Sequence, residues 1–412
     1  VHLGPYPLER LRRVDAPDLM GLPRPQPLEF RRPDAPESIV NAMAEYQAMM
    51  DAIRDGFVNK ARAECPDDPR ERANHLKSFG YFADSSMMGV CRLPPEARLA
   101  SPWRNPDIDR LAHDLKTRQT KTLASGIDMI MADLKESMEA PPSTIDAHTY
   151  ALVVLFQMPR PPRAGEPGTD WLQGAEAHCA ALRATETAVV LANYVRLLGY
   201  DAKAHSATSS DVDLNRLAVE AGLAIGEEGV LVNPFLGSRF GLAALTTTFQ
   251  MMPDRPLARH QPLFGTRGPA WWAGFRTRKG ALNKDSYARR RYVDGPHPFE
   301  TLKRVDAPTT LIDEPRVPRI PKRSDMFARA QFGDLGKHVQ DNAKGGHYAR
   351  KSPTSSAQRR MLGAFVLLQD GPGEAGPRPT DAKGNAANVK AAAYFLGVDA
   401  AGISRCPEWT WY

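Results

Sequence analysis

The sequence predicts an α+β (mixed α/β) fold in which a sheet is flanked by helices and which is internally duplicated. Three observations carry this prediction. Methionine, isoleucine, alanine and leucine recur at helical spacing in residues 38–60 and 108–137. Residues 150–156 form a continuous apolar run, which is typical of a buried strand. A fourteen-residue motif near the N-terminus recurs late in the chain.

The elements expected from residue 150 onwards alternate between strand and helix. Pro159 ends the apolar run, and residues 175–198 are expected to form one long helix that stops at Gly199. The patterns then predict a strand, a helix and two more strands, at residues 200–205, 211–221, 229–232 and 242–250. Because the two types alternate, we expect them to pack as helices on a sheet.

The composition is that of a globular protein without a membrane span. Of the 412 residues, 42% are hydrophobic and 25% are charged, and the formal net charge is +6. The apolar runs are far shorter than the roughly 20 residues of a spanning helix, so no membrane partner is expected. The four cysteines are scattered and include no C-x-x-C pair, which is typical of thiols in a reducing compartment. A cytoplasmic protein is therefore expected.

An internal repeat divides the chain. Residues 4–17 recur as residues 295–308, an offset of 291, with identical residues at most positions. A weaker echo relates residues 89–94 to residues 402–407 at an offset of 313. The second copy would thus begin near residue 295 and reach its first strand at residues 402–407.

The repeat predicts two domains. The first repeat is expected over residues 1–294, with a proline-rich arm at residues 1–37 and a basic linker at residues 258–294. Residues 295–412 are expected to be the beginning of a second repeat. Since this copy is much shorter than the first, we expect the natural polypeptide to extend past Tyr412.

Residues 193–256 carry an ordered set of motifs. A helix end that reads LGY-x-A is followed by A-x-x-AGL, a strand bracketed by glycines, P-x-x-G-x-R and finally D-x-P at Asp254-Arg255-Pro256. This order resembles that of the cobalamin-dependent reductive dehalogenases, and more distantly that of the epoxyqueuosine reductases. The duplication resembles the soluble, catabolic branch of the dehalogenases, in which a degenerate copy precedes the catalytic copy.

The resemblance implies a fold and a chemistry for the whole protein. It implies the nitroreductase-like cobalamin-binding fold, and removal of halide from halogenated aromatics such as halophenols. Cobalamin would be the cofactor, and two 4Fe–4S clusters beyond this chain would supply electrons from a donor reductase. A homo-oligomer is left open. The enzyme activity is expected of the full-length protein, and this chain alone is expected to be inactive.

The first repeat departs from the family where its chemistry would lie. Residues 257–294 contain no cysteine, although thiolates are the ligands of iron–sulfur clusters. The family's catalytic tyrosine would fall at Ala180 or Ala181, and alanine has no proton to donate. We therefore expect a degenerate first copy, assign no catalytic residue in this chain and expect no metal site.

Two groups of residues remain as candidates for binding. Trp409, Trp411 and Tyr412 follow the expected second-copy strand, at a place that resembles the substrate-pocket wall of the dehalogenases. Their alternative interpretation is that of ordinary core aromatics. Arg239 matches a family arginine that could bind an anion. Since the tyrosine is missing, we favour a structural role for Arg239, as the anchor of a loop between two strands.

Two other functions are kept as alternatives. The chain could be a non-catalytic scaffold or interaction module derived from the same fold. The second alternative is nucleic-acid binding through residues 276–291, where seven basic side chains are interleaved with aromatic ones. That composition also fits a linker whose arginines pair with acidic side chains of a neighbouring domain, so no nucleic-acid partner is expected.

Overall fold

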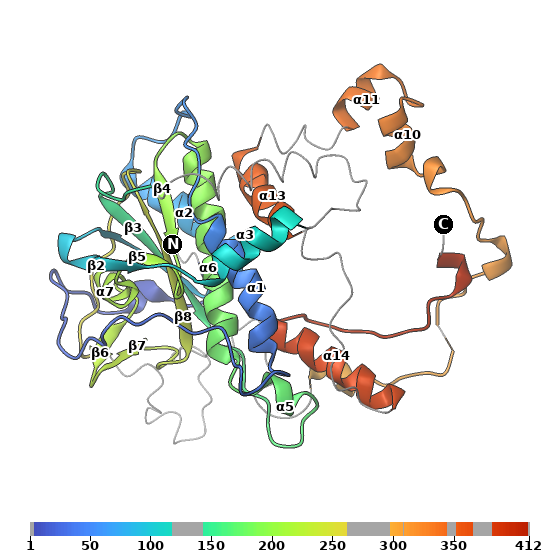
Figure 1. Ribbon diagram of the computed structural model, residues 1–412, viewed down its shortest axis with the longest axis horizontal. Coiled ribbons are helices and arrows are strands. Elements are labelled where there is room, and N and C mark those ends of the chain that lie inside the picture. Colours follow the sequence, from blue (N-terminus) through green and yellow to red (C-terminus); the bar gives the residue numbers. More distant parts are fainter. Residues whose placement is uncertain are drawn as a thin grey trace, which may run out of the picture.

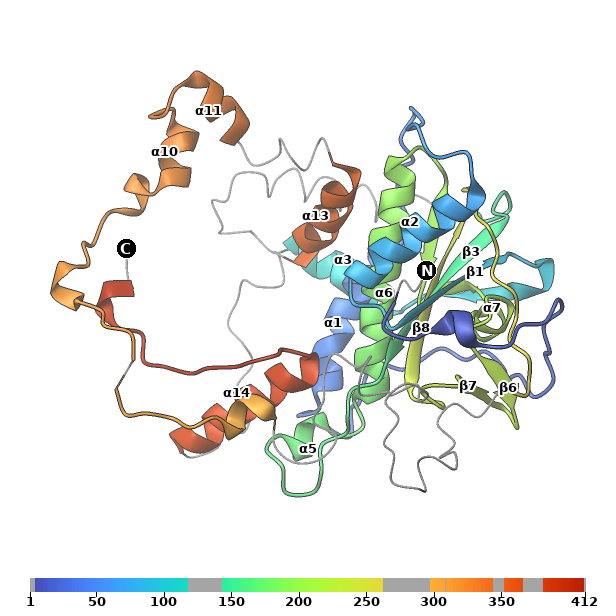
Figure 2. The same cartoon turned by 180° about the vertical axis from the view of Figure 1, so that it is seen from behind.

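The computed structural model describes residues 4–117, 143–261, 297–307, 309–343, 352–365 and 381–410. Figure 1 shows a packed body built around a sheet, with the helices of the C-terminal third on one side of it. Two of these helices lie against the body, whereas residues 309–343 extend away from it in both views (Figures 1 and 2).

The main sheet has four strands in the order β1-β3-β8-β4, and every neighbouring pair is antiparallel. Two further antiparallel pairs join β2 to β5 and β6 to β7. The predicted mixed class is confirmed, with antiparallel sheets. The strands are β1 (Met87–Arg92), β2 (Arg98–Trp103), β3 (Tyr150–Gln157), β4 (Ala202–His205), β5 (Ser210–Val212), β6 (Ile225–Glu227), β7 (Val230–Val232) and β8 (Phe240–Thr247).

The helices of the first 261 residues surround this sheet. They are α1 (Ile39–Ala52), α2 (Pro69–Phe82), α3 (Asp107–Thr117), α5 (Thr169–Leu172), α6 (Glu176–Leu197) and α7 (Leu214–Glu220). After residue 297 come α10 (Met326–Phe332), α11 (Lys337–Ala343), α13 (Pro353–Phe365), α14 (Ala382–Leu396) and the short 3-10 helices η3 (Pro298–Thr301) and η7 (Glu408–Thr410).

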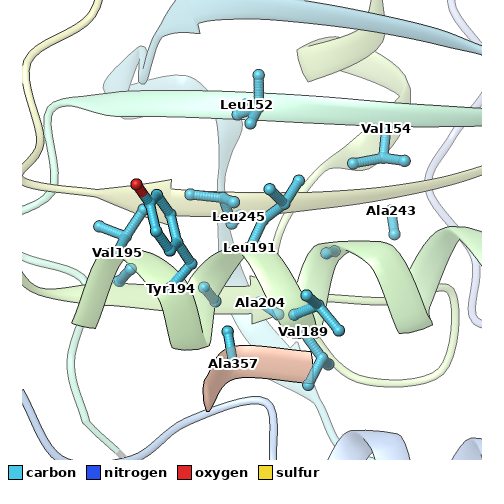
Figure 3. Close-up of a cluster of buried hydrophobic side chains, with 14 of the residues drawn as sticks. Leu152, Val154, Val189, Leu191, Tyr194, Val195, Ala204, Ala243, Leu245 and Ala357 are labelled. Carbon is cyan, nitrogen blue, oxygen red and sulfur yellow. The ribbon is translucent and has the colours of Figure 1, made fainter. Parts of the chain in front are cut away.

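Both faces of the sheet are buried, and β3 supplies side chains to both. Leu152 and Val154 pack in one cluster with residues of α6, including Leu191 (Figure 3). Ala151 and Val153 point to the opposite face, where they pack with residues of α7. Because successive strand residues face opposite sides, a strand covered on both faces has an uninterrupted apolar sequence.

Most of the expected elements are confirmed, with shifted ends. The long helix is α6, and Gly199 follows it in the left-handed region with φ of +86°. The strand expected at residues 200–205 begins only at Ala202. Of residues 38–60, α1 covers 39–52, and α3 covers the start of the pattern at 108–137. Residues 118–142 lie outside the described part.

The expected helix at residues 211–221 was wrong at its beginning. Residues 210–212 form β5, which pairs with β2, and the helix starts only after Asp213. The side chain of Asp213 accepts hydrogen bonds from the backbone N–H groups of Asn215 and Arg216, which fixes it as the N-cap. The strand expected at 242–250 begins earlier, since β8 pairs with β3 from Phe240 onwards.

The two repeats share a local structure. Helix α14 occupies the positions of α2 shifted by 313 residues, and each follows an aspartate N-cap, Asp68 or Asp381. The backbone N–H of Met88 donates to the Tyr81 hydroxyl at 3.2 Å, and that of Ala401 donates to the Tyr394 hydroxyl at 3.3 Å. The arrangement of helix and following segment is therefore repeated at the level of single hydrogen bonds.

The expected strand of the second copy was wrong for the described residues. Residues 402–407 have no regular secondary structure. Their counterpart β1 is a strand because it pairs with β3 over its whole length. Within the described ranges no strand lies beside residues 402–407, so their backbone groups have no ladder to join.

We expect the Asp254→Ala substitution to lower the free energy of unfolding by about 2 kcal/mol. The Asp254 carboxylate accepts from the Lys77 ammonium at 2.6 Å and from the Val90 backbone N–H at 2.7 Å, and both partners would lose a charged acceptor. Urea unfolding followed by circular dichroism measures the change. Asp15 is the matched control because its pair with Arg255 is exposed, so Asp15→Ala should cost under about 0.5 kcal/mol. Equal losses would contradict the anchoring role of Asp254.

Candidate functional site

A cavity of about 300 Å³ lies beside Ala181, one of the two positions expected for the missing tyrosine. Ala181 of α6 lines it, together with Gly241 and Leu242 of β8 and Val230 of β7. The described residues of its lining include no acid, base, tyrosine or cysteine. Ala180, the other candidate for the tyrosine position, is buried in the core. Neither alanine places a proton donor at this site.

The cavity does not fit a corrinoid. About 300 Å³ is the lower end of the range for pockets that hold drug-sized molecules, and a corrinoid macrocycle is larger than these. In the ranges that the structure describes, no three His, Cys, Asp or Glu side chains are grouped to hold a metal ion. His178 and His205 have different hydrogen-bond partners. The His178 ring bonds to the Glu29 carbonyl, and the His205 ring bonds to the Thr246 hydroxyl.

Arg239 lies beside this cavity but is not part of its lining. Its Nη2 donates to the carbonyl of Pro159 at 2.8 Å, and its own carbonyl accepts from the Met158 backbone N–H at 3.1 Å. Both bonds connect the segment after β3 to the segment before β8. The guanidinium is thus used to join two chain segments.

Of the three aromatic residues proposed for a substrate pocket, the structure describes Trp409. Trp409 lies half-buried in the short helix η7, in the part of the chain that extends from the packed body. Trp411 and Tyr412 lie outside the described residues, as do residues 276–291. Their assignment as a pocket wall stays a prediction.

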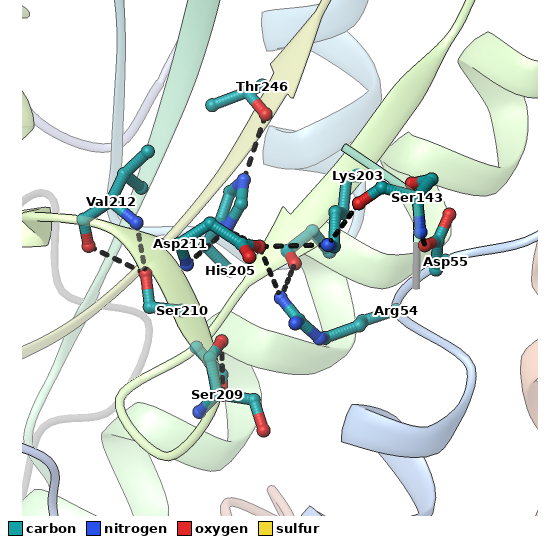
Figure 4. A network of polar contacts seen from close by, with 12 residues as sticks. Arg54, Asp55, Ser143, Lys203, His205, Ser209, Ser210, Asp211, Val212 and Thr246 are labelled. Atoms are coloured by element: carbon teal, nitrogen blue, oxygen red, sulfur yellow. Dashed lines mark hydrogen bonds and ion pairs between the residues drawn. The ribbon is translucent and has the colours of Figure 1, made fainter. Parts of the chain in front are cut away.

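Sequence reasoning missed a network of buried and half-buried charged side chains at the β4 edge of the sheet (Figure 4). The Asp211 carboxylate lies 3.0 Å from the Arg54 guanidinium, 3.0 Å from the Lys203 ammonium and 3.4 Å from the His205 ring. Lys203 also donates to the Ser143 carbonyl at 2.7 Å, although only 1% of its surface is exposed. The alternation Ala202-Lys203-Ala204-His205 in an expected strand was the one signal that could have indicated it.

The charged neighbours of Asp211 and His205 shift the pKa values of both residues. Burial alone would raise the pKa of Asp211, but Arg54, His205 and Lys203 outweigh it and lower that pKa. Burial lowers the pKa of His205 well below its usual value, and the positive charge of Arg54 lowers it further. None of these four residues lines the cavity beside Ala181. One carboxylate thus pairs with two cations away from that cavity, and the network joins the segments that carry Arg54, Lys203 and Asp211.

As the pH falls below about 6.5, we expect the free energy of unfolding to decrease through His205, with a slope that approaches about 1.4 kcal/mol per pH unit. The unfolded chain takes up a proton on this ring near its ordinary pKa of 6.5, while the folded chain leaves it neutral, so acid favours the unfolded state. The neighbours that set its state are Arg54, Lys203, Asp211 and His148. Urea unfolding between about pH 7 and pH 5.5 measures the slope.

The control for this slope is His205→Gln, whose amide reaches the Thr246 hydroxyl without titrating. We expect a shallower slope for the variant over the same range. An identical slope in both proteins would show that His205 is not the group responsible.

Comparisons with known proteins give one strong similarity. No protein-family model matches the chain, and no curated protein matches it. Among solved structures, the catabolic reductive dehalogenase NpRdhA aligns with a TM-score of 0.75 and 34% identity, covering 100% of this chain and 53% of that chain. A structure of NpRdhA in complex with 3-bromo-4-hydroxybenzoic acid matches equally, with 52% of that chain covered.

Two further matches differ greatly in strength. A reductive dehalogenase structure that suggests a mechanism for B12-dependent dehalogenation aligns with a TM-score of 0.76 and 34% identity, over 100% of this chain and 53% of that chain. Epoxyqueuosine reductase from Streptococcus thermophilus aligns with a TM-score of only 0.27 and 12% identity, over 78% of this chain and 98% of that chain. The chain spans about half the length of the dehalogenases that it matches.

Proposed function

Since the chain is similar over its whole length to about half of a catabolic reductive dehalogenase, we propose that it is part of such an enzyme. The observation that carries this proposal is the 34% identity combined with a TM-score of 0.75 over the complete chain. The enzyme removes halide from halogenated aromatics such as halophenols in a cytoplasmic, reducing compartment. Cobalamin supplies the carbon–halogen bond cleavage, and two 4Fe–4S clusters supply the electrons.

Within that enzyme, residues 1–294 form the degenerate repeat and serve as a scaffold. The absence of a proton donor at Ala180 and Ala181 and the small cavity beside them support this role. Residues 295–412 begin the catalytic repeat, and the repeated hydrogen bond at Tyr81 and Tyr394 supports their correspondence to the first copy. The cofactor and both clusters are bound by residues outside this chain.

The exposed apolar surface of the C-terminal part supports the same division of roles. Leu302 and Val305 are 54% and 61% exposed, whereas Leu11, the first-copy counterpart of Leu302, is 5% exposed in the core. Other large apolar side chains of the same part are exposed too, among them Leu311, Met326, Phe327 and Phe332. Groups of exposed apolar side chains are typical of surfaces that contact another part of a protein or a partner. In the proposed enzyme the rest of the catalytic repeat covers them. In the alternative, a non-catalytic interaction module, another protein would cover them.

The proposal is tested on the protein expressed from its complete gene with cobalamin supplied. We expect about one cobalt and about eight irons per polypeptide, since each 4Fe–4S cluster holds four, and release of bromide from 3-bromo-4-hydroxybenzoic acid under reducing conditions. The 412-residue chain, purified in parallel, should contain neither metal. Absence of cobalt or of bromide release from the complete protein would refute the enzyme. Stoichiometric cobalt in the 412-residue chain would refute the scaffold role of its first repeat.

A further inference from the structure

A second and larger cavity, of about 490 Å³, lies between the two repeats. One wall comes from Pro162 and Pro167 of the loop before α5 and from Leu172 at the end of α5. The other comes from α14, with Ala387, Ala391 and Phe395. The two views agree that α14 lies beside α5 (Figures 1 and 2), and Phe395 is buried in a cluster that contains Leu172. The cavity therefore depends on the docking of the second repeat onto the first.

The charged side chains at this cavity are paired with one another. Nη2 of Arg160 lies 2.9 Å from a carboxylate oxygen of Glu166. Across the cavity, Nζ of Lys390 lies 2.9 Å from Oε2 of Glu300. The other carboxylate oxygen of Glu300, Oε1, accepts from the Tyr394 hydroxyl. The bonds from Tyr394 and Lys390 lower the pKa of Glu300, so both acids are ionised at neutral pH. Two cations face two anions, and the lining has no net charge.

The rest of the lining suits a flat, apolar molecule. The rings of His297 and Tyr394 are stacked, with centroids 3.8 Å apart and planes inclined by 9°, and both residues line the cavity. Aromatic rings pack well against such faces and against proline rings. The volume falls within the range of small-molecule pockets, which are mostly apolar with a few polar groups at their edges.

We propose that this cavity binds a neutral aromatic molecule of one or two rings. A charged ligand would find each cation and each anion of the described lining already paired, so it would gain no free partner there. A neutral ring loses little on desolvation and gains contact with both repeats. A phenolic hydroxyl on it could reach the carboxylates at the rim without displacing their partners. The cavity lies in the described chain itself, so its binding does not require the chain to be a dehalogenase.

The experiment uses the 412-residue chain and two probes that differ in charge at pH 7. These are 4-bromophenol, which is neutral, and 4-bromobenzoate, which is ionised. Isothermal titration calorimetry should give a Kd below about 1 mM for the phenol and at least about tenfold weaker binding for the benzoate.

Two variants of α14 locate the binding. Ala387→Leu places three more carbon atoms in the cavity and should weaken phenol binding at least about tenfold. Ala386→Leu is the matched control, because Ala386 is a half-buried alanine on the same helix outside the lining, and it should change the Kd less than about twofold. Circular dichroism verifies that both variants are folded.

Three results would overturn the proposal. If 4-bromophenol does not bind at any concentration up to its solubility limit, the cavity is not a site for this class of ligand. Binding of 4-bromobenzoate as tight as that of the phenol would refute the neutral ligand class. Equal weakening by the two leucine substitutions would place the binding elsewhere.

Discussion

Replacement of Asp51 by alanine is expected to lower the free energy of unfolding by about 3–4 kcal/mol. The carboxylate is 2% exposed and accepts four side-chain hydrogen bonds, from Gln47, Asn105, Ser206 and Thr208. Alanine removes the common acceptor and leaves a void among four buried donors. Urea unfolding at neutral pH measures the loss.

Two comparisons separate this network effect from the loss of a charge. Burial raises the pKa of Asp51 above its usual range, although the four hydrogen bonds act in the opposite direction. Asp51→Asn keeps one acceptor oxygen and should cost about half as much as alanine. Glu45→Ala on the same helix removes an exposed charge 3.8 Å from Arg110, and it should cost under about 0.5 kcal/mol. A loss at Asp51→Ala no larger than that of Glu45→Ala would contradict the network.

The second large effect is expected for Gly241→Val, at about 3 kcal/mol or more. A Cβ at position 241 would lie 2.5 Å from the carbonyl carbon of Ala180 and from the backbone N of Ala181. Those atoms belong to the backbone of α6, which cannot turn aside as a side chain can. The helix would have to move away from β8, the strand at the centre of its contact with the sheet.

Thermal and urea unfolding compare Gly241→Val with a glycine that has free space. At Gly402 an added Cβ meets no described atom within 4 Å, so Gly402→Val should change the free energy of unfolding by under about 0.5 kcal/mol. If Gly241→Val were as mild as Gly402→Val, the close approach of α6 to β8 would be disproved. Gly241→Ala should give an intermediate loss.

The similarity to reductive dehalogenases could be predicted from the sequence because it rests on motifs in a fixed order. The structure now assigns physical roles to some of them. Asp254 of the D-x-P turn holds Lys77 and Val90 of β1, and Gly199 of the LGY motif ends α6 in a left-handed conformation. These are structural roles, and such motifs are expected to remain in the degenerate copy that we propose.

What the sequence by itself determined is the class of fold, the elements with strong periodicity and the duplication. The strand β3 could be predicted because apolar side chains fill it almost continuously, and the helix α6 because its apolar residues are many and Gly199 marks its end. The repeat could be predicted because the arm of each copy keeps the same residues at fixed spacing.

Only the tertiary structure decided what depends on distant partners. The sequence 210–212 became a strand because β2 lies beside it, and residues 402–407 did not, because no described strand lies beside them. The pairing of Asp211 with Arg54, and of Asp51 with Ser206 and Asn105, joins residues over 50 positions apart, for which the sequence has no periodic signal. The cavity between the repeats has the same origin, since a space between two surfaces exists only once both surfaces are placed.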